Sequence, residues 1–238
     1  MSAMLLFLCV IAAIAIWWSA GQGLLSKPWL EVGIASGPRD GHDADRPKLP
    51  VQKVGLGVFL AVVGALFTLF ISAYLMRVNT QDWWATPVPR LLYVNTAILF
   101  ASSLCLHWAK VEAVRGRREQ LRTAMLAGLM TALAFVTGQV FAWRQLVAAG
   151  YLLADDAATS FFYVITGMHG LHILGGMVAL ARAARLVRTE AIVTPRLRLS
   201  VELCATYWHF MLAVWLVLLA LFAGWAGSFI AFCRQLIT

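Results

Sequence analysis

Charged residues are scarce in this sequence, and long stretches have none. Asp, Glu, Lys and Arg make up 13% of the 238 residues, whereas apolar residues make up 61%. The runs without any of these four residue types are 1–26, 54–76, 91–109, 123–143, 157–181 and 203–233. Each run is long enough to cross a hydrocarbon core as a helix, which takes about 20 residues. The composition therefore predicts an all-α, polytopic transmembrane bundle of about six helices rather than a soluble domain.

Three other patterns are missing. The apolar runs show no alternation of polar and apolar residues, which argues against a transmembrane β-barrel. No pair of cysteines has Cys-x-x-Cys spacing among Cys9, Cys105, Cys204 and Cys233, so neither a disulfide framework nor a zinc site is indicated. No internal repeat is visible, so an inverted-repeat transporter gains no support, although a transporter stays an alternative.

The basic residues that give the net charge of +8 are concentrated in alternate loops. The first, third and fifth loops carry clusters of Lys and Arg, whereas the second and fourth loops and the C-terminal tail carry one or two each. This is the positive-inside pattern, and it predicts that both termini lie outside the cytoplasm. We expect a transmembrane helix at 1–26, a cytoplasmic linker at 27–53 and a five-helix domain at 54–238. The basic charge indicates topology and not a nucleic-acid partner.

Several polar side chains interrupt the apolar runs. Asn95, Ser102 and Ser103 lie in the third run and Gln139 in the fourth, where we expect hydrogen bonds between neighbouring helices. His107 lies near the predicted cytoplasmic boundary, and we expect it to meet water or lipid headgroups rather than a metal.

The stretch 160–178 holds the densest polar pattern in an apolar run. His169 and His172 are three residues apart and leave one face of a helix, and in the last run Glu202 and His209 are seven apart and share a face. Ionisable groups in hydrocarbon normally face protein or a water cavity.

Three interpretations of these groups stay open. Haem or metal ligation by His172 and His209 is one, although the helical zinc pair has a spacing of four with a Glu beside it, which is not the spacing here. Proton transfer is the second, but polar groups are missing from the outer half of these helices. A structural network of mutually bonded groups is the interpretation we favour, because buried polar groups must be paired whether or not they act.

These residues carry a resemblance to a known family. The segments NTAILFASSLCLHWA, TSFFYVITGMHGLHILGG and ELCATYWHFMLAVWLVLL, in this order, resemble subunit III of the haem–copper respiratory oxidases. The spacing of Glu202, Tyr207, Trp208 and His209 is similar to the family's E-x4-YWH pattern. The resemblance covers about Gly55 to Trp225 and leaves the first run outside.

The resemblance implies a non-catalytic accessory subunit of an oxidoreductase complex in a bacterial cytoplasmic (inner) membrane. In such a complex the haem and copper lie in the partner subunit I, subunit II and other members are further partners, and this chain has no catalytic residue, metal or cofactor of its own. The family binds phospholipids in a cleft between its helices and supports proton uptake and turnover stability. The matching lipid and polar-cleft candidates are His169, His172, Glu202, Tyr207, Trp208 and His209, with Arg185 or Arg188 as the residue that binds the lipid phosphate.

Two positions depart from the family pattern. Val63 stands where a glutamate is often found, and Leu212 where an aspartate is often found. The missing acids indicate a divergent branch and argue against a proton-antenna role. The oxidase-like companion subunits of nitric oxide reductases belong to the same superfamily and are an alternative, as is a membrane haem protein that uses His172 and His209.

Overall fold

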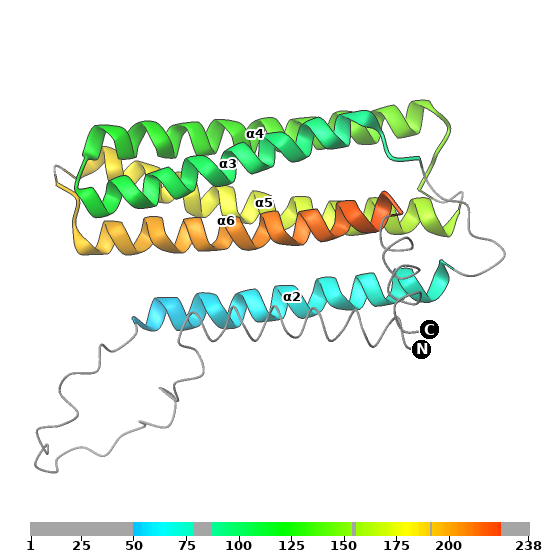
Figure 1. Cartoon of the computed structure of the whole chain (residues 1–238), viewed down its shortest axis with the longest axis horizontal. Coiled ribbons are helices and arrows are strands. Elements are labelled where there is room, and N and C mark those ends of the chain that lie inside the picture. Colours follow the sequence, from blue (N-terminus) through cyan, green and yellow to red (C-terminus); the bar gives the residue numbers. More distant parts are fainter. Residues whose placement is uncertain (1–49, 79–86, 154–155, 191, 225–238) are drawn as a thin grey trace, which may run out of the picture. The chain divides into compact units, whose positions relative to one another are not determined.

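The computed structural model describes residues 50–78, 87–153, 156–190 and 192–224, and within these ranges all regular structure is α-helical. The helices are α2 (Val51–Arg77), α3 (Arg90–Arg115), α4 (Arg118–Ala148), α5 (Ala157–Thr189) and α6 (Pro195–Phe222) (Figure 1). All five are long and apolar enough to cross a membrane. The predicted all-α, multi-pass class is confirmed. The predicted helix at 1–26, most of the predicted linker and both termini lie outside the described residues.

The helices extend beyond the uncharged runs. α3 continues through Lys110 to Arg115, and α4 begins at Arg118, so the predicted third loop is mostly helical and turns at Gly116 and Arg117. Backbone hydrogen bonds of a helix do not require an apolar side chain, and a basic residue near a helix C-terminus is favourable. The first charged residue after an uncharged run therefore marks the end of the apolar span but not the end of the helix.

The chain divides after Ala65 into two compact units, Met1–Ala65 and Leu66–Thr238. The first unit contains the N-terminal part of α2, and the second contains the rest of α2 together with α3 to α6. All contacts discussed below lie within the second unit.

In the second unit, α3 to α6 form a ring of four helices. α3 packs against α4 and α6, and α5 packs against the same two helices (Figure 1). Large side chains such as Leu99, Phe135 and Trp215 fill the interior and are almost fully buried. Apolar side chains also cover the outside, for example Leu133 on α4 and Leu171 on α5, as expected where lipid replaces water.

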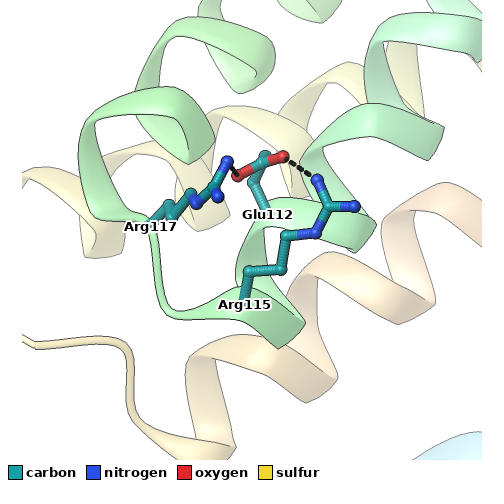
Figure 2. A network of polar contacts seen from close by, with 3 residues as sticks. All are labelled: Glu112, Arg115 and Arg117. Atoms are coloured by element: carbon teal, nitrogen blue, oxygen red, sulfur yellow. Dashed lines mark hydrogen bonds and ion pairs between the residues drawn. The ribbon is translucent and has the colours of Figure 1, made fainter.

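The turn between α3 and α4 is organised around a buried carboxylate. Gly116 caps α3 with a φ of 71°, a left-handed conformation that favours glycine, and the Arg117 amide donates to the Glu112 carbonyl. Figure 2 shows the Glu112 side chain between two arginines, with 2.9 Å from Oε1 to Arg115 Nη1 and 3.8 Å from Oε2 to Arg117 Nη1. The carboxylate is only 3% exposed, so these cations compensate for its loss of water. Two arginines of the basic third loop thus have a structural role.

Side-chain hydrogen bonds stabilise both ends of α5. At its start, Asp156 accepts hydrogen bonds from the amide and the hydroxyl of Thr159, both at 2.8 Å. At its end, Arg118 at the start of α4 donates to the carbonyls of Val187 and Arg188, which have no partner further along the helix. α4 and α5 are therefore held in a fixed register at the end of the bundle that the charge pattern assigns to the cytoplasm.

Candidate functional site

His169 lies in the centre of the bundle among aromatic rings. It is fully buried, and its ring centroid lies 4.9 Å from that of Trp215 on α6 and 6.0 Å from that of Phe135 on α4. Neither ring nitrogen has a hydrogen-bond partner among the described residues. The structural network that we favoured from the sequence therefore does not include His169, which acts in this arrangement as an aromatic packing residue.

His172 and Tyr207 connect α5 to α6. The Tyr207 hydroxyl donates to the backbone carbonyl of His172 at 2.6 Å, and His172 Nδ1 lies 2.8 Å from the Met168 carbonyl one turn earlier. Gly176 makes the approach of the two helices possible, because a Cβ atom at this position would clash with the rings of Tyr207 and Trp208. Gly176 is thus part of the packing surface between α5 and α6, whereas Gly170 and Gly175 face open space.

Trp208 fills the interior at this same contact. Its side chain is fully buried, and its indole N–H has no acceptor among the described residues. Tyr207 and Trp208 therefore belong to the α5–α6 contact, whereas the next residue of the YWH pattern, His209, contacts α3.

His209 faces a different helix from the residues just described. Its Nδ1 lies 2.5 Å from Ser103 Oγ on α3, and its ring centroid lies 5.7 Å from that of His107. Both histidines are exposed on the outside of the bundle. His172 and His209 are therefore directed at different neighbours, which does not support the alternative in which they ligate one haem. Within the described residues, no three His, Cys, Asp or Glu side chains converge as metal ligands would.

The remaining predicted residues lie towards the ends of α5 and α6. Arg185 and Arg188 are exposed in the last two turns of α5, and Glu202 is half-buried in α6. By helix rise Glu202 lies about 10 Å along α6 from His209, so the two share a face without being adjacent.

The hydrogen bonds that we expected between helices are present. Asn95 Nδ2 donates to Gln139 Oε1 at 3.2 Å, which joins α3 to α4, and Ser102 donates to the Gly128 carbonyl at 3.0 Å. With the contact between Ser103 and His209, all four polar side chains singled out in the apolar runs bond to another helix, and this prediction is confirmed.

Two further bonds between helices escaped sequence reasoning because they use tryptophan. Trp215 Nε1 donates to Thr96 Oγ1 at 2.9 Å, between α6 and α3, and Trp143 Nε1 donates to Thr166 Oγ1 at 3.1 Å, between α4 and α5. The tryptophans in the apolar runs could have predicted these bonds, since a buried indole N–H usually finds an acceptor. The arrangement as a whole uses its polar groups to join helices, and this is the chemistry of a structural bundle.

Comparison with known proteins gives consistent matches. The family model described as "Cytochrome c oxidase subunit III" matches residues 84–227. A "Probable cytochrome c oxidase subunit 3" of Nocardia farcinica is 31% identical over 186 residues, which are 75% of this chain and 89% of that protein. A protein of the same description from Mycobacterium tuberculosis is 33% identical over 186 residues, 74% of this chain and 88% of that protein. The "Cytochrome c oxidase subunit 3" of Thermostichus vulcanus is 29% identical over 188 residues, 76% of this chain and 89% of that protein.

Proposed function

Because the chain belongs to the cytochrome c oxidase subunit III family, we propose that it is a non-catalytic, lipid-binding subunit that stabilises a haem–copper terminal oxidase in a bacterial cytoplasmic membrane. Electron transfer and oxygen reduction would take place on the haem and copper of the partner subunit. The observation that carries the structural role is the use of polar side chains inside the bundle, which bond helix to helix between α3 and α4, α3 and α6, α4 and α5, and α5 and α6. A bundle whose helices are joined in this way is suited to stabilise a neighbouring subunit.

The outward face of α5 supports the lipid-binding part of the proposal. Leu171, Leu174 and Val178 follow one another along this face, each about half exposed, and nothing lies within 4 Å of where a Cβ at Gly175 would stand. Arg182, Arg185 and Arg188 are exposed on the turns that follow. From Leu171 to Arg182 the helix rises roughly 16 Å. An apolar stripe that ends in arginines matches a phospholipid, whose acyl chains lie along the stripe and whose phosphate meets guanidinium groups.

The predicted polar-cleft residues enter this proposal in two ways. Arg185 and Arg188 are the candidates for contact with the lipid phosphate, since both are exposed. His169, Tyr207 and Trp208 are buried and would set the spacing of the helices that carry those arginines. His172 and Glu202 are half-buried, so they are less exposed than the arginines and more exposed than His169, Tyr207 and Trp208.

The lipid contact is tested by measuring the phospholipid that remains on the purified complex. We expect the double variant Arg185→Ala/Arg188→Ala to retain less phospholipid after a detergent wash than the unchanged protein. Arg196→Ala/Arg198→Ala is the matched control, because these arginines are also exposed but lie at the start of α6. Equal lipid loss in both double variants would show bulk attraction of headgroups and no site on α5.

The oxidase assignment is tested by affinity purification of the tagged chain from its own membranes in mild detergent. Co-purification of a haem-containing core that consumes oxygen is the expected result, and a core that consumes nitric oxide instead would identify the companion of a nitric oxide reductase. A chain recovered alone and colourless would contradict the assignment. A chain recovered alone with a Soret band would make it a haem protein.

A further inference from the structure

A layer of buried polar side chains crosses the interior of the four-helix ring. Asn95 on α3, Gln139 on α4 and His169 on α5 are each at most 3% exposed, and we call these three residues the polar layer. Trp215 on α6 relates their depths to one another. Its indole N–H donates to Thr96, the chain neighbour of Asn95, and its ring centroid lies 4.9 Å from that of His169.

A second aromatic ring connects the polar layer on the side of α4. Phe135 lies one turn before Gln139, about 6 Å along the helix by rise. Its ring centroid is 6.0 Å from that of His169 and 5.1 Å from that of Trp215. The amide pair of α3 and α4 and the imidazole of α5 therefore lie within about one helical turn of the same two rings.

The polar layer contains four hydrogen-bonding atoms that the bundle itself does not satisfy. Within the described ranges, no protein group pairs with Asn95 Oδ1, with Gln139 Nε2 or with either ring nitrogen of His169. The bond from Asn95 Nδ2 to Gln139 Oε1 uses one donor and one acceptor of the two amides and leaves the others over. Native proteins leave few buried polar atoms unpaired, and ordered internal water is a common partner of those that the protein cannot pair.

The four atoms are balanced between donors and acceptors. Asn95 Oδ1 accepts and Gln139 Nε2 donates, and a neutral His169 imidazole has one N–H donor and one acceptor nitrogen. Exchanging oxygen and nitrogen in both amides would again leave one donor and one acceptor. Neither a carboxylate nor a Lys or Arg side chain belongs to the layer, so its chemistry does not match an ion. A water molecule both donates and accepts, which is the combination that these atoms require.

We propose that the polar layer is an internal water-binding site, in which bound water bridges the amide pair of Asn95 and Gln139 to the imidazole of His169. α3 and α5 lie on opposite sides of the ring, because each packs against both α4 and α6. In the part of the chain that the structure describes, side-chain hydrogen bonds between helices join only neighbours in the ring. The water would connect the two opposite helices and fix the depth of α5 against the α3–α4 pair. The layer lies inside this chain, so its hydration does not depend on the partner subunits of the proposed function.

Water-edited solid-state NMR on the full chain in lipid bilayers, labelled at His and Ile, tests the site directly. At short mixing times we expect magnetisation transfer from water to the ring of His169, whose signal is identified by its loss in the variant His169→Phe. Ile173 is the matched control, because it is fully buried one turn further along α5 and has no polar side-chain atom. We expect no transfer to its side chain.

Two results of this measurement would overturn the proposal. Absence of transfer to His169 would show that the imidazole is dry. Equal transfer to His169 and Ile173 would show general penetration of water into the bundle and no site at the polar layer.

A double-mutant cycle tests the bridge between the amide pair and the imidazole. His169→Phe and Gln139→Met each leave the bridging water with fewer partners, so each should lower the SDS concentration at which half of the protein is unfolded. Once one end of the bridge is lost, the second change should lower this midpoint by less than it does alone.

The control cycle pairs His169→Phe with Ser102→Ala. Ser102 is also buried on α3, but it bonds to the Gly128 carbonyl and lies about 10 Å along the helix from Asn95 by rise. The shifts in this control cycle should add. Additive shifts in both cycles would contradict a shared bridge, and a raised midpoint for His169→Phe would show that the ring nitrogens have no water partner.

Discussion

Gly176 determines how closely α5 and α6 approach each other. The rings of Tyr207 and Trp208 occupy the space in which a side chain at 176 would lie, and both rings are held by burial. Gly175 beside it has open space at the corresponding position. Of these two adjacent glycines, only Gly176 is needed for the close approach of α5 and α6.

This difference predicts opposite outcomes for two alanine substitutions. Gly176→Ala should destabilise the protein by about 1–3 kcal/mol, the usual result of inserting atoms into a packed interior. Gly175→Ala should be neutral or stabilising, since alanine has the higher helix propensity by about 1 kcal/mol. Unfolding by SDS titration in detergent micelles, followed by circular dichroism, measures both changes. Equal stability of the two variants would show that the rings can move aside.

His169 illustrates what residue-by-residue reasoning misses. From the sequence it shares a helix face with His172, which led us to expect both in one polar network. In the structure His172 reaches a backbone carbonyl, whereas His169 points into a space lined by Phe135 and Trp215. Those rings come from α4 and α6, so no local pattern in α5 could identify them.

At the scale of elements, amide pairing joins α3 to α4. The side chains of Asn95 and Gln139 are buried against each other, with one hydrogen bond between them. The Asn95 amide lies over Gly138, where a side chain would leave no room for it. The glycine next to Gln139 thus makes the pair possible.

A double-mutant cycle tests this pair. Asn95→Leu and Gln139→Met replace each amide by an apolar side chain of similar length, and each should destabilise the bundle by about 1–3 kcal/mol because the remaining amide is left buried without a partner. The double variant should be more stable than the sum of the single changes predicts, since no orphaned amide remains. The same SDS titration gives the free energies of unfolding. Additive changes would mean that the two amides act independently.

At the scale of the whole molecule, the bundle is expected to affect the lifetime of its complex more than its chemistry. A strain that lacks this chain should assemble an oxidase whose initial rate of oxygen consumption is close to normal, because the reacting centres would lie in another subunit. Its activity should then decline several-fold faster during turnover, since bound lipid and a neighbouring bundle would no longer protect the core. Oxygen consumption followed over many turnovers measures both quantities. A normal lifetime would contradict the stabilising role, and an immediate loss of activity would indicate a direct part in catalysis.

The sequence by itself determined the class of the protein and the positions of its spans. Uncharged runs of about 20 residues require helices in lipid, because each backbone group must be paired within its own segment. It also identified the side chains that form hydrogen bonds between helices, since a polar side chain in an apolar span has few other partners. These residues are Asn95, Ser102, Ser103 and Gln139. The bounds of the helices were less well predicted, because α3 and α4 continue through charged residues that the membrane excludes but a helix does not.

Only the tertiary structure decided which helix each polar group meets. Residues 207 to 209 are consecutive, yet Tyr207 bonds to α5, Trp208 fills the interior and His209 bonds to α3. Successive residues of a helix point in directions about 100° apart, so their partners depend on which helices lie on each side. The order of helices in the ring, with α3 beside α6 and α5 beside both α4 and α6, is set by packing between segments far apart in the chain. That order placed His107 next to His209, a contact between residues of two different spans that spacing within either one could not predict.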